Sequence, residues 1–250
     1  MSIEIYETKI MDMRNKVIFI TGGASGLGLA TAKRCIFKKA EVVIADYSPK
    51  VEEIAKEIGA VGIRLDVTKE EDIKAAFEAT VEKFGRIDGV LCSAGIGGDQ
   101  NTIANETLEN WEKVNAVDYT GLMLTNKYAI QQMLKQESGG SVVNLASMFG
   151  LVAVPTNVAY SAAKGGVINL TRAAGSAYAS KGIRVNAVCP GVIDTPLISE
   201  EEKKAYKNLH PANRLGTAEE VSNLILFLLS DAASFINGAS IPIDGGYTAI

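Results

Sequence analysis

Short apolar runs rich in valine and isoleucine recur along this chain, and longer stretches with helical periodicity separate most of them. The runs occupy Val17–Ile20, Glu41–Ala45, Val61–Leu65, Gly89–Cys92, Ser141–Ala146, Arg184–Val188 and Ser240–Ile243. A short apolar run of this kind is typical of a strand that is buried on both faces. The pattern therefore predicts seven strands, most of them connected by helices.

The predicted helices lie between these strands. They are Gly26–Lys38, Pro49–Ile58, Lys69–Phe84, Leu108–Asn115 continuing toward Gln136, Asn157–Lys181 and Ala218–Ser230. This order favours right-handed βαβ units in an α/β domain, a doubly wound Rossmann sheet of about seven parallel strands with helices on both faces. An α/β barrel would need one more strand. No linker divides the chain, so we expect one domain over residues 16–250, after a loosely packed extension over residues 1–15.

The scarce residue types exclude several kinds of protein. A net charge of −4 offers no basic surface for nucleic acid. One histidine, His210, and three cysteines without Cys-x-x-Cys spacing argue against a metal site and against a Ser-His-Asp hydrolase. Residues 1–15 do not have the pattern of a signal peptide, and no apolar run is long enough to span a bilayer. We expect a cytoplasmic protein without a metal, nucleic-acid or membrane partner.

A glycine-rich segment, Thr21–Gly28, joins the first strand to the first helix. Ligands of such sheets bind beyond the carboxyl ends of the strands. Glycines let the backbone approach a pyrophosphate, and the helix N-terminus favours its negative charge. The segment therefore predicts a dinucleotide site, with a ligand-free tight turn as the alternative. Its Gly-x-x-x-Gly-x-Gly spacing differs from the Gly-x-Gly-x-x-Gly of the usual Rossmann motif.

Two acidic residues follow the next strands. A carboxylate at Asp46, at the end of the second strand, can accept hydrogen bonds from ribose hydroxyls and would repel the 2′-phosphate of NADP. No lysine or arginine lies in the glycine segment or at Tyr47, so the sequence favours NAD. Asp46 could instead cap the next helix. Asp66, after the third strand, could bind the adenine amino group or cap the helix that begins near Lys69.

A Tyr–Lys pair and a serine form the candidate catalytic group. Tyr160 and Lys164 share one helix face, although such pairs are also common on helix surfaces. A phenol has a pKa of about 10, and a nearby ammonium lowers that value toward the range of a useful base. Ser147 follows the strand Ser141–Ala146, at the same edge of the sheet. Asn115 is unfavourable within a helix, which indicates a local task such as holding a water or kinking the helix.

Together these residues resemble the short-chain dehydrogenase/reductase family in its single-domain form, over nearly the whole chain from Lys16 to Tyr247. The resemblance rests on Thr21–Gly28, Asp66-Val67, Cys92-Ser93-Ala94-Gly95, Asn115, Ser147, Tyr160, Lys164, Pro190-Gly191 and Asp244-Gly245-Gly246-Tyr247. One departure stands out, because the family usually has Asn-Asn where this chain has Cys92-Ser93. The second of those asparagines braces the sheet centre, so Ser93 would have to do so with a shorter side chain.

The resemblance implies a role for each catalytic position. Tyr160 would exchange the alcohol proton, and Ser147 would bind the substrate oxygen. Lys164 would hold the nicotinamide ribose and lower the pKa of the phenol. Asn115 would position a water in a proton relay from Lys164. Hydride would pass between a carbinol carbon and C4 of the nicotinamide of NAD.

The resemblance also implies the binding residues. For NAD they are Gly22, Ser25, Gly26, Leu27, Gly28, Asp46, Tyr47, Asp66, Val67, Ser93, Ala94, Gly95, Tyr160, Lys164, Pro190, Gly191, Ile193 and Thr195. For the substrate they are Ser147, Phe149, Val154, Tyr160 and Leu197. Met148, Phe149, Leu151, Val152 and Val154 form an apolar wall beside Ser147, and Glu200–Lys207 forms a charged lid helix. This combination favours a bulky hydrophobic substrate such as a hydroxysteroid or bile acid.

Two other functions remain open. A 3-oxoacyl-acyl-carrier-protein reductase resembles this chain broadly, although Asp46 and the net charge of −4 argue against it. A non-catalytic NAD-binding scaffold or sensor is the alternative of another class. Members of the family pair two long helices with those of a partner, and Asn115–Gln136 and Asn157–Lys181 are apolar enough for such an interface. We therefore expect a homotetramer.

Overall fold

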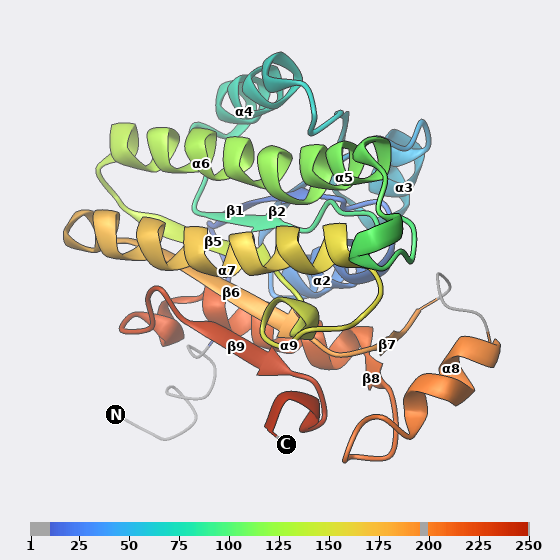
Figure 1. Ribbon diagram of the computed structural model, residues 1–250. Helices are drawn as coiled ribbons and strands as arrows, with labels where there is room; N and C mark the ends of the chain where they lie inside the picture. Colours follow the sequence, from blue (N-terminus) through green and yellow to red (C-terminus); the bar gives the residue numbers. More distant parts are fainter. Residues whose placement is uncertain (1–10, 196–199, 250) are drawn as a thin grey trace, which may run out of the picture.

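A seven-stranded parallel sheet forms the centre of the protein, as the sequence predicts (Figure 1). The computed structural model describes residues 11–195 and 200–249. The strands are β1 Val17–Thr21, β2 Glu41–Asp46, β3 Val61–Arg64, β4 Gly89–Cys92, β5 Gly140–Leu145, β6 Ile183–Pro190 and β9 Ser240–Ile243. Their order is β3-β2-β1-β4-β5-β6-β9. The order reverses between β1 and β4, so the carboxyl ends of these two strands flank the crevice where ligands of such sheets bind.

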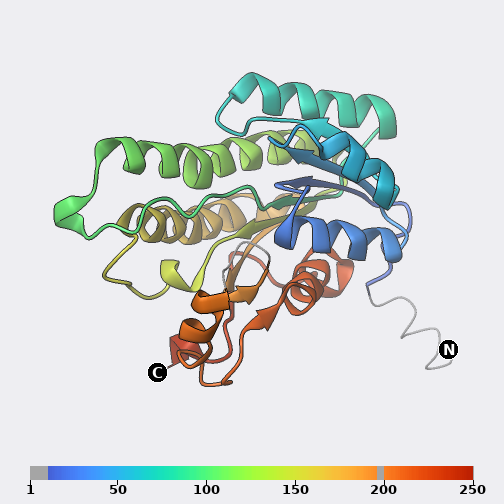
Figure 2. The same ribbon diagram turned by 90° about the vertical axis from the view of Figure 1, so that its right-hand side faces the viewer.

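Helices cover both faces of the sheet (Figure 2). They are α2 Gly26–Phe37, α3 Val51–Ile58, α4 Glu70–Phe84, α5 Leu108–Asn115, α6 Leu122–Gln136, α7 Val158–Tyr178 and α9 Ala218–Leu229. Buried residues of α4, α6 and α7 form one core with the sheet, in which the rings of Phe19 and Phe77 lie 4.6 Å apart. Buried residues of α2, α3 and α9 form the other core. Within residues 11–195 and 200–249, no helix is long and apolar enough to cross a membrane.

Part of the predicted extension belongs to the second core. Met13 is fully buried, and its backbone N–H donates to the carbonyl of Lys38 at 3.1 Å. The expectation of a loosely packed extension does not hold for Met11 and Met13, because both pack against the core that includes α2, whereas Arg14 and Asn15 are exposed. The helix predicted from Pro49 begins at Val51, and α7 ends in a separate 3₁₀ turn over Ala179–Lys181.

The segment between β6 and α9 holds two elements beyond the main sheet. Strands β7 (Ile193–Asp194) and β8 (Gly216–Thr217) pair in parallel as a small second sheet. Two residues are too few to give a strand pattern in sequence, so the sequence analysis missed both. The charged helix predicted over Glu200–Lys207 is present as α8.

A π-helical turn, η2, covers Ala116–Gly121 and joins α5 to α6. The sequence predicts one continuous helix here, with Asn115 as an unfavourable residue inside it. The structure ends α5 at Asn115, whose side-chain amide donates to the carbonyl of Trp111 at 2.8 Å. A π turn has one residue more than the α turn it replaces, so it changes which side chains face inward. The helix pair runs beside α7 in Figure 1.

Candidate active site

Tyr160 and Lys164 lie together on the inner face of α7. Lys164 is buried, and its Nζ donates to the carbonyl of Leu145 at the end of β5, at 3.0 Å. The same ammonium lies 5.3 Å from the centre of the Tyr160 ring, which is half-buried. The structure thus excludes a solvated surface pair: this lysine is anchored beneath the tyrosine at the carboxyl edge of the sheet.

Ser147 lies on the turn that follows β5. It is buried, and its Oγ accepts the backbone N–H of Phe149 at 3.2 Å, which caps the 3₁₀ turn η3 over Met148–Gly150. Gly150 lies so close to α7 that an added Cβ would stand 2.7 Å from the carbonyl group of Lys164. The turn that carries Ser147 is therefore pressed directly against the helical turn that carries Lys164.

A second charged residue joins this group, and the sequence analysis did not find it. Asp118, in η2, is fully buried, and its Oδ2 lies 3.0 Å from Lys164 Nζ. Its Oδ1 accepts the backbone N–H of Ile96 at 2.8 Å. Burial lowers the pKa of Lys164, but the charge of Asp118, the charge of Tyr160 and the hydrogen bond to Asp118 outweigh burial and leave that pKa raised. Lys164 is therefore held as a cation.

Asn115 is not among the hydrogen-bond partners of Lys164 in the described part of the chain. Its amide donates to Trp111, as described above, and Asp118 is the residue of this segment that contacts Lys164. The π turn is the physical reason, because it changes which residue of this helix faces Lys164. The available sequence signal was a lone acidic residue in an otherwise apolar stretch, between Val117 and Gly121.

The glycine segment has the geometry of a cradle. Gly22 has a φ of +66°, and an added Cβ there would stand 2.7 Å from the backbone nitrogen of Ala94. A Cβ on Gly28 would stand 2.1 Å from the carbonyl oxygen of Gly22. Gly26, with a φ of +51°, has open space where a side chain would be. The first turn of α2 carries no acidic residue, so a pyrophosphate fits at this helix N-terminus, beside Ser25 and Leu27.

Asp46 ties the end of β2 to this cradle. Its Oδ2 accepts the N–H of Ala24 at 3.0 Å, and its Oδ1 accepts the N–H of Ser48 at 2.9 Å. The neighbouring Tyr47 is largely exposed. The carboxylate therefore lies directly beside the glycine segment, where ribose hydroxyls of a dinucleotide would come within reach.

Asp66 is engaged in its own loop. Its Oδ1 accepts the backbone N–H of Thr68 at 3.0 Å and the hydroxyl of Thr68 at 2.7 Å. Burial raises the pKa of Asp66, but these hydrogen bonds from Thr68 outweigh it, and the pKa is lowered. Val67 is buried and packs against Gly121 of η2. The structure thus shows that Asp66 orders the loop before α4, next to the helix pair.

Within the described residues, the centre of the sheet near Cys92-Ser93 is held by Thr21 and by buried asparagines of β5 and α6, not by the side chain of Ser93. The Ser93 N–H donates to the carbonyl and the hydroxyl of Thr21, both at 3.2 Å. Beneath it, the amide of buried Asn126 donates to Asn144 at 2.8 Å and to the Cys92 sulfur at 3.4 Å. Asn144 in turn donates to Thr171 at 3.0 Å. This buried network joins β5, α6 and α7. Ala94 and Gly95 continue from Ser93 toward Asp118.

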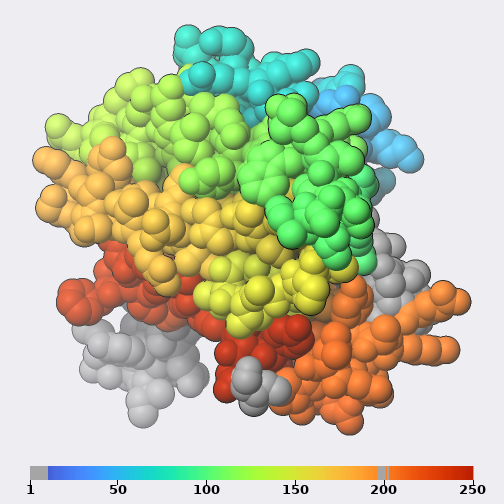
Figure 3. Space-filling model, in the orientation of Figure 1, coloured from blue at the N-terminus to red at the C-terminus, as the bar shows by residue number. Residues whose placement is uncertain are grey.

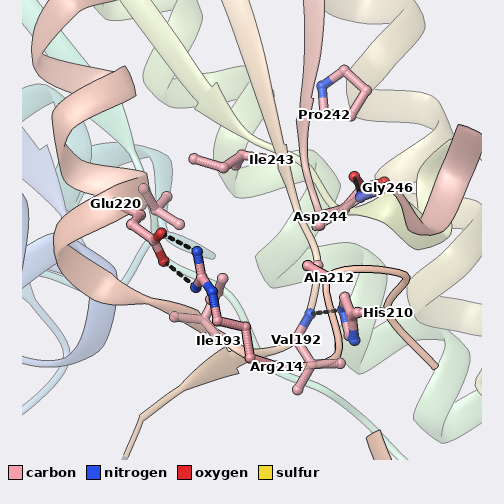
Figure 4. A pocket seen from close by; sticks show the side chains of 14 residues that line it. Val192, Ile193, His210, Ala212, Arg214, Glu220, Pro242, Ile243, Asp244 and Gly246 are labelled. Carbon is pink, nitrogen blue, oxygen red and sulfur yellow. Dashed lines mark hydrogen bonds and ion pairs between the residues drawn. The ribbon is translucent and has the colours of Figure 1, made fainter. Parts of the chain in front are cut away.

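The segment after β6 is held by a backbone hydrogen bond and by the side chain of His210. The N–H of Gly191, which follows Pro190, donates to the carbonyl of Ile243 at 3.0 Å, and the N–H of Val192 donates to His210 Nε2 at 3.1 Å (Figure 4). The other ring nitrogen of His210, which is buried, lies 3.0 Å from the carbonyl of Tyr206. Both nitrogens of this histidine are therefore engaged in structure. Ile193 is buried, and Thr195 is half-buried beyond it.

A cavity of about 340 Å³ lies beside this histidine. Figure 4 shows Arg214 and Glu220 paired across it, through two contacts of 2.9 and 2.6 Å. Ser147, Tyr160 and Lys164 do not line this cavity. Its lining includes Gly191 and Ile193, two of the residues expected to bind NAD, and residues that support the segment after β6.

The predicted substrate wall is smaller than expected. Met148 is buried, and Leu151 packs against the sheet core, so neither side chain belongs to an open wall. Phe149 and Val154 are half-buried. The Phe149 ring packs edge-on to Tyr247 at 6.3 Å, and Tyr247 lies 5.7 Å from His210, where the turn after β5 meets the C-terminal turn (Figure 3). Leu197 lies outside the described residues.

Comparisons with known proteins find similar dehydrogenases and reductases. A family model described as enoyl-(acyl carrier protein) reductase matches residues 22–248. Cis-4-hydroxycyclohexanecarboxylate dehydrogenase of Sinomonas cyclohexanicum is 39% identical, over 94% of this chain and 97% of that protein. Cyclohexanol dehydrogenase of Acinetobacter sp. (strain SE19) is 40% identical, over 96% of this chain and 99% of that protein.

Two solved structures share the fold. A short-chain type dehydrogenase/reductase from Mycobacterium marinum superposes with a TM-score of 0.92 at 31% identity, over 97% of this chain and 99% of that one. Levodione reductase superposes with a TM-score of 0.88 at 38% identity, over 95% of this chain and 99% of that one.

Proposed function

The chain belongs to the short-chain dehydrogenase/reductase family, and on that premise we propose that it is an NAD-dependent dehydrogenase that interconverts a secondary alcohol and a ketone. The observation that carries this proposal is the buried ammonium of Lys164, anchored by Leu145 and Asp118 beneath Tyr160. A cation in that position favours the phenolate form of the tyrosine, which is the form that accepts a proton from an alcohol.

The hydrogen bonds of the site support a proposed role for each group. NAD, when bound, supplies the acceptor or donor of hydride. Because Ser147 Oγ already accepts the N–H of Phe149, its own hydrogen is left to donate to the substrate oxygen. Lys164 Nζ has three hydrogens; one is donated to the carbonyl of Leu145, and Asp118 Oδ2 lies 3.0 Å away as an ion-pair partner. A remaining hydrogen is available to a ribose hydroxyl, and Tyr160 takes the alcohol proton.

The preference for NAD rests on Asp46. Its carboxylate lies against the glycine segment through the N–H of Ala24, and a 2′-phosphate on the adenosine ribose would approach that negative charge. Two like charges in a partly desolvated site repel by about 4 kcal/mol at 4 Å. NADP should therefore bind much more weakly than NAD.

The substrate belongs to the bulky hydrophobic alcohols and ketones. Two of the relatives are named for ring alcohols, and Phe149 with Tyr247 offers an aromatic surface beside Ser147. These names favour a monocyclic substrate, while a hydroxysteroid or bile acid extends the same chemistry to a larger ring system. A 3-oxoacyl-acyl-carrier-protein reductase is the second candidate, and the description of the matching family model is the observation that favours it.

The same helices that carry the site offer a surface for assembly. Trp111, Tyr119 and Met123 are each more than a third exposed, and they follow one another through α5, η2 and α6. A surface of this kind is typical of protein contacts. We propose a homotetramer with two-fold axes, which light scattering at micromolar concentration tests directly. A monomer in that measurement would contradict the proposal.

A substrate panel read by NADH absorbance tests the function. The panel holds cyclohexanols, hydroxysteroids and 3-oxoacyl and enoyl thioesters, each measured with NAD(H) and with NADP(H). Turnover of ring alcohols with NAD that disappears in Tyr160→Phe would support the proposal. Turnover restricted to thioesters would favour the second candidate and reject the first.

A further inference from the structure

Asp118 is a buried carboxylate for which the sequence analysis gave no role. It is fully buried, and it belongs to the π turn, a feature that often marks functional sites. Its two oxygens meet different partners, the N–H of Ile96 and the ammonium of Lys164. A buried charge without a partner is very costly, so Asp118 and Lys164 each stabilise the charge of the other.

The charges around the pair are few. In the described residues, the titratable groups that act on Lys164 are Asp118 from η2, Tyr160 from α7 and Cys189 from β6. Burial, with the nearby charge of Asp244, raises the pKa of the Cys189 thiol to about 12, against smaller opposing effects of Ser147, Arg172 and Lys164. Cys189 is therefore neutral at any working pH. The charged pair at the buried end of this site therefore consists of the cation Lys164 and the anion Asp118.

The negative charge of Asp118 weakens the effect of the Lys164 ammonium on Tyr160. The ammonium alone would favour the phenolate of Tyr160 strongly, because a positive charge within about 4–6 Å shifts an acid by one to three pH units. The carboxylate at 3.0 Å from Nζ cancels part of this field. It also holds Nζ in place, together with the carbonyl of Leu145.

We propose that Asp118 is a positioning residue that fixes Lys164 as half of a buried ion pair and thereby makes Tyr160 act as a base at a higher pH than a neutral residue at position 118 would allow. The inference rests on the proposed function, since it concerns the base of that reaction. Compared with a neutral residue at this position, Asp118 therefore moves the reaction in the direction of alcohol oxidation to higher pH.

Asp118→Asn is the decisive variant. Asparagine has nearly the same shape, and its side-chain oxygen can still accept the N–H of Ile96. Its NH2 group replaces the oxygen that faces Lys164, so the negative charge and the ion pair are lost together while Leu145 still accepts from Nζ. The midpoint of the pH profile of kcat/KM for alcohol oxidation should fall by about one pH unit. Below that midpoint the variant should therefore be up to about tenfold more active than the wild type. A midpoint that stays or rises would overturn the inference.

Two further variants separate charge from structure. Asp118→Glu keeps the negative charge, so its kcat should fall while its pH midpoint stays at the wild-type value. Asp88→Asn neutralises another buried carboxylate, one that accepts the N–H of Val17 and pairs with Arg86 away from the site, and it should leave the midpoint unchanged. A lowered midpoint in either variant would contradict the role of the Asp118 charge.

A titration without substrate keeps this test independent of the proposed function. The near-ultraviolet absorbance of tyrosinate is recorded against pH, and subtracting the Tyr160→Phe curve isolates Tyr160. The same subtraction in the Asp118→Asn background should show Tyr160 ionising at lower pH. If Tyr160→Phe remains active, the proposed base is wrong. If it is inactive while the Tyr160 titration is insensitive to Asp118→Asn, the inference fails and the proposed function stands.

Discussion

The two halves of the sheet's carboxyl edge are built by different means. On the β1–β2–β4 side, backbone packs against backbone, with Gly28 against Gly22 and Gly22 against Ala94 at distances that leave no room for a side chain. On the β5–β6–β9 side, Gly150 also packs against the backbone of Lys164, but a side chain joins two segments, with His210 linking Val192 to Tyr206. The first half depends above all on positions without side chains, and the second depends also on particular side chains.

This difference matches the chemistry proposed for each half. A dinucleotide presents the same pyrophosphate and riboses to every protein, so a rigid backbone cradle suits it. Alcohols differ in shape, and a surface made from side chains is easily altered by substitution. Variants in the two halves should therefore fail in different ways, and the following experiments measure whether they do.

The largest effect is expected from Tyr160→Phe. The change removes one hydroxyl, so the fold and the cofactor cradle should survive, while the loss of the general base should lower kcat by about 10² to 10⁴. NADH binding, measured by fluorescence, should stay near the wild-type value. If more than a tenth of the activity remains, Tyr160 is not the base.

Gly28→Ala should disturb the glycine segment Thr21–Gly28 and leave the β5–β6–β9 side of the sheet edge intact. The new methyl group would stand 2.1 Å from the Gly22 carbonyl oxygen, so the segment must open. A displacement on this scale should raise the KM for NAD by about 10² and leave the KM for the alcohol little changed. Gly165→Ala is the matched control, because the nearest atom to its methyl group would be 3.8 Å away. Equal losses in the two variants would refute the steric argument.

Asp46→Ala should narrow the preference for NAD over NADP. Loss of the carboxylate removes the repulsion of a 2′-phosphate, so the ratio of kcat/KM between the two cofactors should fall at least about tenfold. Asp46→Asn separates the charge from the hydrogen bond to Ala24 and should narrow the ratio as well. A wild-type enzyme that uses both cofactors equally would remove the basis of this prediction.

The smallest effect is expected from His210→Ala, on the side-chain half. The change leaves the N–H of Val192 and the carbonyl of Tyr206 without their present partner, which costs about 1–3 kcal/mol of folding free energy. The Tm should fall. Because Val192 lies between Gly191 and Ile193, which are expected to bind NAD, the KM for NAD should rise a few-fold together with the KM for the alcohol. Unchanged values of both would show that this histidine supports the fold alone.

The sequence predicted the parts that depend on local pattern. Seven strands, their parallel pairing and the Tyr160–Lys164 face follow from apolar runs and helical spacing, and the structure contains all of them. The two-residue strands β7 and β8 were missed, because such pairing depends on distant contacts. Asp118 was missed for a related reason: residue type favoured Asn115, whereas the π turn decides which residue faces Lys164.

Because of the π turn, the number of residues in the segment 116–121 matters to the site as much as their identity. Such a turn corresponds to an α-helix with one residue inserted. Deleting one residue within 116–121 would restore a regular helix and rotate one side against the other by about 100°. Either Asp118 would leave Lys164, or buried Leu122 and Met133 of α6 would turn away from the core. Substitutions can therefore alter this site in small steps, whereas the deletion of one residue from this segment would separate Asp118 from Lys164 or α6 from the core.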